Sequence, residues 1–162
     1  MEENHPEEHL LDDIMGGFGF QPTIWKVQVA VLFVLFALGF AGNTSVLVML
    51  IRNRLAVNRT IRQLILNLVI ADFCVAIFCI LTMAIWHYTL QWLGGDFLCR
   101  MSKYMQMFSL YASTFIITVI AIDRCIAVTA PMRKIDSPKC TTKMIIIAWI
   151  LAALFSIPQV QF

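Results

Sequence analysis

Charged side chains are scarce in this sequence. They make up 14% of its 162 residues, whereas apolar residues make up 60%. A soluble domain has roughly 25% charged residues, because these coat the surface that folding leaves in water. The shortage excludes an ordinary soluble domain, a disordered tail and a nucleic-acid-binding protein.

Long segments without charge are the main feature of what is present. Apart from Asp72 they contain no acidic or basic residue, and they cover 27–51, 63–95, 104–122 and 144–162. A helix needs roughly 20 apolar residues to cross the hydrocarbon core of a bilayer. The expected fold class is therefore an all-α membrane protein with four transmembrane helices, because a soluble bundle would lack polar residues for its outer faces. We expect these helices at about 25–51, 61–88, 97–130 and 142–161.

The charges that are present lie unevenly along the chain. Six of the ten acidic residues fall within the first 13 positions, and the basic residues gather mainly at 52–62 and 124–143. Short loops rich in Lys and Arg stay on the cytoplasmic side of a membrane. We therefore expect an extracellular acidic tail at 1–24 and a helical region at 25–162, with both basic clusters in the cytoplasm and Phe162 outside.

Asp72 is the one charged residue within a predicted membrane segment. A carboxylate at that depth is costly and should face the interior of the bundle with polar partners. Asn43 and Ser113 lie at comparable depths in neighbouring predicted helices. Two interpretations are open for Asp72, Asn43 and Ser113: a small hydrated cation site, or a hydrogen-bonded Asp that holds helices together.

The third predicted helix has chemically distinctive residues at both ends. Cys99 and Arg124 are separated by roughly 37 Å of helix, slightly more than the thickness of the hydrocarbon core. Arg124 could contact a cytosolic partner and be held by Asp123 in its absence, or it could serve only as a basic topology anchor. Cys99 faces outside and has no partner in this chain, which indicates an incomplete piece of a larger protein.

Five short motifs then resemble one family, the rhodopsin-like (class A) G-protein-coupled receptors. Trp92, Gly95 and Cys99 resemble the first extracellular loop, and Asp123-Arg124-Cys125 with Pro131 resembles the Asp-Arg-Tyr motif. The remaining motifs, from helices 1, 2 and 4, are Gly42-Asn43 with Val46, Leu68-Val69-Ile70-Ala71-Asp72, and Trp149 with Pro158. The resemblance covers residues 25–162 and implies the first four helices of a seven-helix bundle in the plasma membrane, without helices 5–7.

The resemblance also implies roles for particular residues. Asp72 and Ser113 would line a sodium pocket, and Cys99 would form a disulfide with the second extracellular loop. Arg124 would insert toward the α subunit of a heterotrimeric G protein. Met132 would pack into an apolar pocket of that subunit. The implied partners are a peptide hormone, a G protein, membrane lipid and a second receptor copy, with no nucleic acid. Beyond an allosteric sodium ion, no cofactor is expected.

The sequence near the outer ends of helices 2 and 3 is similar to receptors of the gonadotropin-releasing hormone, adipokinetic hormone and corazonin group. The similarity implies peptide contact at the outer third of helix 3 and the end of helix 2. Lys103 and Gln106 lie in that part of helix 3, are three apart and share a helix face. Trp86 and Trp92 offer aromatic surface at the same level, although such rings also settle at the membrane interface.

The sequence is also compatible with other functions. Vasopressin/oxytocin-type receptors also resemble the chain at Lys103, Gln106 and 123–127. A truncated isoform that pairs with the full-length receptor without signalling is a further alternative. An enzyme is not expected, because the sequence has no nucleophile–base pair and no metal-ligand cluster.

Overall fold

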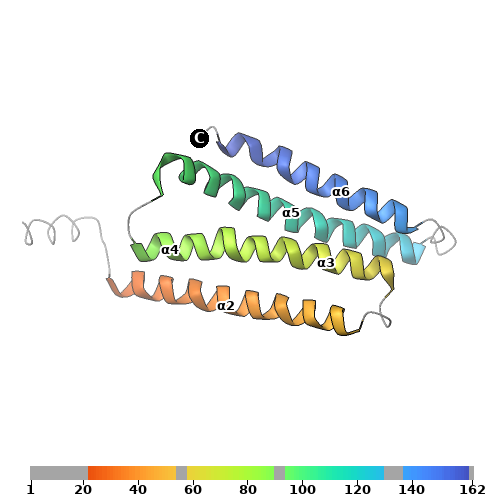
Figure 1. Ribbon diagram of the computed structural model, residues 1–162, viewed down its shortest axis with the longest axis horizontal. Coiled ribbons are helices and arrows are strands. Elements are labelled where there is room, and N and C mark those ends of the chain that lie inside the picture. The colour runs from red at the N-terminus through yellow and green to blue at the C-terminus, as the bar shows by residue number, and fades with distance from the viewer. Residues whose placement is uncertain (1–21, 54–57, 90–93, 130–136, 161–162) are drawn as a thin grey trace, which may run out of the picture.

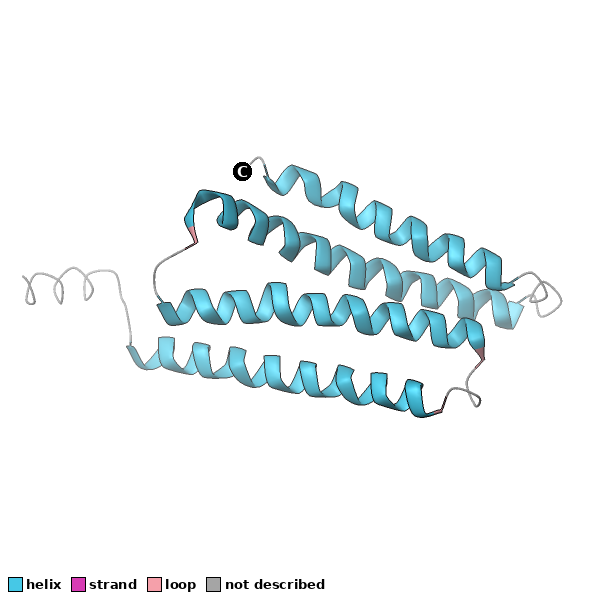
Figure 2. Cartoon of the chain, viewed as in Figure 1, coloured by secondary structure: helices cyan, strands magenta, loops and turns pink. Residues whose placement is uncertain are grey.

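The structure, a computed structural model, describes residues 22–53, 58–89, 94–129 and 137–160. Within these ranges every regular element is a helix (Figure 2). The described residues form four helical stretches that are long and apolar enough to cross a membrane: Ile24–Arg52, Arg59–Thr89, Gly95–Thr129 and Lys139–Gln159. The expected fold class is confirmed, and the chain is a membrane protein. The expected acidic tail lies, up to residue 21, outside the described residues.

The second and fourth spans are each built from more than one helical segment. The second contains a π-helix, η1, and the fourth ends in a short 3₁₀-helix, η3. The four spans begin one to three residues before the starts expected from the sequence, at Ile24, Arg59, Gly95 and Lys139. In chain order the elements are α2 (Pro22–Arg52), α3 (Arg59–Cys74), η1 (Val75–Leu81), α4 (Thr82–Thr89), α5 (Gly95–Thr129), α6 (Ser137–Ser156) and η3 (Ile157–Val160).

Local sequence signals mark three of the helix starts. α2 begins at Pro22. Proline suits the first helical turn, because the backbone N–H groups of that turn have no acceptor within the helix and proline has no N–H. Asn58 caps α3, and its side-chain oxygen accepts a hydrogen bond from the backbone N–H of Thr60 at 3.2 Å. Gly95 starts α5 with a φ of 70°, a left-handed conformation that other residues adopt only with strain.

The spans lie side by side, and consecutive spans run in opposite directions (Figure 1). α5 packs against both α3 and α6, so it occupies the middle of the arrangement. α2 packs against the segments of the second span and leaves large apolar side chains uncovered; Leu38, for example, is 66% exposed. Such uncovered apolar side chains suit contact with lipid tails. Lipid tails are as apolar as these side chains, so the hydrophobic effect does not drive them into the protein interior.

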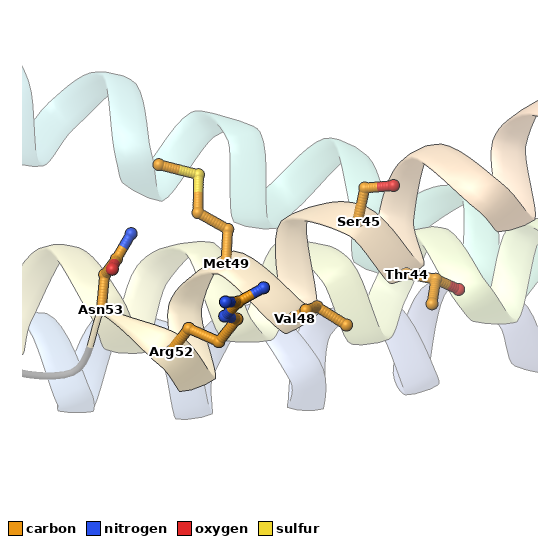
Figure 3. Close-up of a pocket in the computed structure, with 6 residues that line it drawn as sticks. All are labelled: Thr44, Ser45, Val48, Met49, Arg52 and Asn53. Atoms are coloured by element: carbon orange, nitrogen blue, oxygen red, sulfur yellow. The ribbon is translucent and has the colours of Figure 1, made fainter.

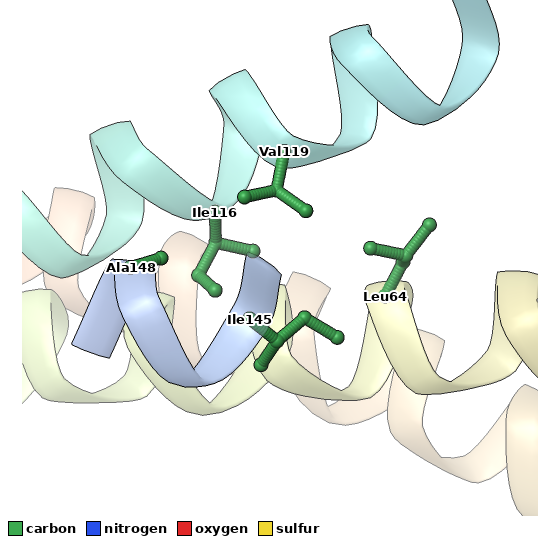
Figure 4. Packing of buried hydrophobic residues seen from close by; sticks show 5 residues of the cluster. All are labelled: Leu64, Ile116, Val119, Ile145 and Ala148. Atoms are coloured by element: carbon green, nitrogen blue, oxygen red, sulfur yellow. The ribbon is translucent and has the colours of Figure 1, made fainter. Parts of the chain in front are cut away.

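The largest buried cluster joins the second, third and fourth spans (Figure 4). Leu64 of α3 meets Ile116 and Val119 of α5 and Ile145 and Ala148 of α6. Leu64 and Ile116 are fully buried. These side chains fix how α3, α5 and α6 sit relative to one another.

Small residues form a second junction between the same three spans. Ala71, Ala112 and Ala152 are all fully buried and pack together. Small side chains let helix backbones approach closely, which is how helices in membranes gain packing contacts. The junction lies one residue before Asp72, so the backbone beside that carboxylate is closely packed.

The π-helix rotates the outer part of the second span. Ala76 and Ala84 are both buried and are eight positions apart, whereas Met83, seven positions after Ala76, is 43% exposed. Seven residues bring an α-helix back to nearly the same face, and a π turn holds one residue more. The Thr82 hydroxyl follows the same wider turn and donates to the Ile77 carbonyl at 3.3 Å. The π-helix segment contains no proline or glycine, so the sequence gives no local signal for it.

Candidate functional site

Asp72 and Ser113 meet between the second and third spans. The Ser113 hydroxyl donates to the Asp72 carboxylate, with an Oγ–Oδ1 distance of 2.9 Å, and both residues are half-buried. Carboxylate and hydroxyl oxygens are ligands that suit a hard cation such as sodium. Asn43 lies on α2 and makes no hydrogen bond to either of them within the part of the chain that the structure describes.

A second polar contact lies five residues before Asp72. The indole N–H of Trp149 donates to the side-chain oxygen of Asn67 at 3.0 Å, and the Asn67 amide donates to the Gln63 carbonyl at 2.9 Å. This contact joins the second span to the fourth. Our sequence reasoning missed Asn67, although a lone amide in an apolar segment was the signal that could have found it.

The predicted peptide-contact residues lie toward the Gly95 end of α5 and the Thr89 end of α4. Cys99, Lys103 and Gln106 of α5 are all partly exposed, and Trp86 of α4 is 44% exposed. Trp92, the remaining member of the predicted set, lies outside the described residues. Cys99 carries a free thiol in this chain.

The backbone at Gln106 is held from two sides. Its carbonyl accepts a hydrogen bond from the Ser109 hydroxyl at 2.9 Å and from the Cys79 thiol at 3.4 Å. The Cys79 sulfur also lies 3.3 Å from the Ser109 oxygen. The second and third spans are thus joined at the level of Gln106, and its side-chain amide takes no part in these contacts.

Asp123 and Arg124 lie near the opposite end of α5, where the side chains differ in exposure. The Asp123 side chain is 12% exposed, and the Arg124 side chain is 46% exposed. The Arg124 guanidinium nitrogen lies 3.9 Å from Asp123 Oδ2, while the Thr141 hydroxyl of α6 donates to Asp123 Oδ1 at 3.0 Å. Thr141 was not among the predicted residues, and Met132 lies outside the described residues.

An open hollow of about 530 Å³ runs along α2 near Arg52 (Figure 3). The hydroxyls of Thr44 and Ser45 line it but donate to carbonyls of their own helix, at 2.7 and 2.8 Å. None of the residues predicted for peptide, ion or G-protein contact lines this hollow. Its residues are Thr44, Ser45, Val48, Met49, Arg52 and Asn53.

The described residues contain no group of three or more His, Cys, Asp or Glu side chains that could hold a metal ion. The polar groups instead form three separate levels along α5. Gln106 lies toward the Gly95 end, Ser113 with Asp72 near the middle, and Asp123 with Arg124 toward the Thr129 end.

Comparison with known sequences decides the family. The rhodopsin family of seven-transmembrane receptors matches residues 42–162. The chain belongs to this family. The resemblance drawn from the sequence motifs is therefore confirmed, and the family is one of receptors.

Several peptide receptors are similar to this receptor chain. A gonadotropin-releasing hormone receptor of Octopus vulgaris is 43% identical over 137 residues, which cover 85% of this chain and 33% of that receptor. An isotocin receptor of Catostomus commersonii is 39% identical, over 83% of this chain and 34% of that receptor. A human vasopressin V1b receptor is 39% identical, over 88% and 34%. The chain thus spans about a third of the length of these relatives.

Proposed function

We propose that this chain forms the first four helices of a neuropeptide hormone receptor of the gonadotropin-releasing hormone, adipokinetic hormone and corazonin group. The receptor lies in the plasma membrane with its N-terminus outside. A peptide hormone binds near Lys103, Gln106, Trp86 and Trp92, and a heterotrimeric G protein binds near Arg124 and Met132. The placement of Gln106 and Arg124 toward opposite ends of one helix, α5, carries this proposal.

The mechanism is an allosteric coupling between the two faces of the membrane. Peptide bound at the outer face shifts the bundle toward the conformation that binds the G protein. Within the resting bundle, Asp123 restrains the guanidinium of Arg124 beside α5. In the active bundle the Arg124 guanidinium, which stays charged at any cellular pH, offers its five donors to the G protein.

The middle level of α5 supports the same transmission. Asp72 and Ser113 supply oxygen atoms that would hold a sodium ion, which would supply positive charge beside the half-buried carboxylate when bound. Their hydrogen bond links the second span to the third halfway between the peptide and the G protein. A change in that link alters how the two spans pack.

The proposal is tested by Arg124→Ala in a seven-helix receptor that contains this chain. Peptide-stimulated nucleotide exchange on the G protein should be lost, while peptide binding persists because the peptide contacts lie at the other end of α5. Asp123→Asn should raise basal exchange, since it removes the restraining charge. Exchange at wild-type rates in Arg124→Ala would make Arg124 a topology anchor only.

A vasopressin/oxytocin-type receptor is the second candidate. The similarity to an isotocin receptor and to a vasopressin receptor favours it. The two candidates differ in the peptide that activates them. A panel with peptides of both groups, applied to the same seven-helix receptor, separates them by which peptide stimulates exchange at the lower concentration.

A further inference from the structure

The two carboxylate oxygens of Asp123 have different partners. Oδ1 accepts a hydrogen bond from the Thr141 hydroxyl at 3.0 Å, whereas Oδ2 lies 3.9 Å from the nearest Arg124 nitrogen. A charge-assisted bond between a guanidinium and a carboxylate is typically 2.7–2.9 Å long. The carboxylate is therefore bonded to Thr141 of α6 and only loosely paired with its neighbour in the chain.

Packing between α5 and α6 fixes this geometry. Val119 precedes Asp123 by four residues on α5, and Ile145 follows Thr141 by four residues on α6, so each pair shares a helix face. Val119 and Ile145 belong to the same buried cluster (Figure 4). The contact between Thr141 and Asp123 continues this interface by one turn, and Thr141 is itself only 3% exposed.

We propose that Thr141 is a positioning residue that shares the Asp123 carboxylate with Arg124 and so weakens the hold on Arg124 in the resting receptor. This rests on the proposed function, in which Asp123 restrains Arg124. Thr141 does not touch the G protein in this proposal. It acts through Asp123, by keeping one carboxylate oxygen turned toward α6.

Loss of the Thr141 hydroxyl leaves that oxygen against an apolar side chain. A carboxylate that is 12% exposed then needs another donor, and Arg124 is the basic side chain within 4.0 Å of it among the described residues. The carboxylate turns to Arg124 and closes the 3.9 Å gap. The resting conformation is stabilised as a result, so that fewer receptors reach the active one.

The test compares three variants in a seven-helix receptor that contains this chain. Thr141→Val keeps the shape of the side chain but removes the donor, and it should lower basal nucleotide exchange about threefold per receptor at the cell surface. Thr141→Ser keeps the donor and should restore wild-type exchange. Thr129→Val is the control, because the exposed Thr129 hydroxyl, among the described residues, donates to the Cys125 carbonyl of its own helix.

A double variant assigns the effect to Asp123. In an Asp123→Asn background, Thr141→Val should change basal exchange by much less than threefold, because there is no carboxylate left to share. Unchanged or raised exchange in Thr141→Val, or an equal fall in Thr141→Ser, overturns the proposal while Arg124→Ala still abolishes coupling. If Arg124→Ala exchanges nucleotide normally, the proposed function itself has failed and this inference fails with it.

Discussion

Cys99 has no disulfide partner among the cysteines of this chain. All five cysteines of the chain carry free thiols, and Cys99 is in the first turns of α5. Cys99 resembles the cysteine that, in receptors of this family, forms a disulfide with the second extracellular loop. We expect Cys99→Ala in a seven-helix receptor to reduce the amount of receptor at the cell surface or its peptide affinity, because the loop loses its attachment.

The expected loss for Cys99→Ala follows from the stability that a disulfide contributes. Loss of a native disulfide costs about 2–5 kcal/mol in small secreted domains, which gives the scale. Cys74→Ala is a suitable control, since Cys74 lies within the second span and is half-buried. Surface labelling and peptide binding measure both variants. Equal loss from the two substitutions would argue against a disulfide at Cys99.

Gln106 offers a sharper test of the peptide site. Its carbonyl is held by Ser109 and Cys79, so Gln106→Ala removes the side-chain amide while the backbone contacts remain. If the amide bonds the peptide, affinity should fall by about tenfold, which corresponds to about 1.4 kcal/mol. A competition binding assay measures the change. Thr114→Ala serves as the control, because the exposed Thr114 hydroxyl bonds its own helix; unchanged affinity in Gln106→Ala would exclude the amide as a contact.

At the scale of elements, the contact of Asn67 with Trp149 joins α3 to α6. Trp149→Phe removes the indole donor but keeps an aromatic ring against Phe108, whose ring centroid lies 5.8 Å from that of Trp149. Hydrogen bonds between membrane helices contribute about 0.6 kcal/mol on average and about 1.7 kcal/mol at most. We therefore expect a loss of stability within that range, measured by thermal unfolding of the receptor in detergent.

A double-mutant cycle identifies the source of that loss. Asn67→Leu and Trp149→Phe should cost less together than the sum of the two single changes, since each removes the same bond. Additive losses would show that the two side chains stabilise the bundle independently. The cycle thereby tests whether the second and fourth spans are coupled through this contact.

At the scale of the whole molecule, four spans alone should not signal. The family to which the chain belongs has seven transmembrane segments, and the described spans leave apolar side chains of α5 uncovered, such as Ile117 at 53% exposure. Residues 1–162 expressed in cells should give no peptide-dependent nucleotide exchange. The seven-helix receptor in the same cells is the positive control, and a response from the four-span piece would contradict the expectation.

Much of the fold was predictable because a bilayer imposes simple requirements on a sequence. Each span needs roughly 20 apolar residues, so charge-free segments such as 27–51 and 104–122 locate the helices directly. The pairing of side chains was much less predictable. Asp123 was expected to hold Arg124, yet its short hydrogen bond goes to Thr141, a residue in another span that no sequence signal singled out.

The fold class, the number of apolar spans and the family follow from the sequence, since they depend on where charge is absent and on short motifs in order. The packing of the folded bundle, in contrast, sets which polar groups meet. The partners of Asp72, Asp123 and Asn67 lie 41, 18 and 82 positions away. The tertiary structure also decided that Ala84 and not Met83 faces the interior, because η1 adds a residue to one turn. Both outcomes depend on how the helices pack, and packing in a membrane is set by the shapes of side chains from several spans at once.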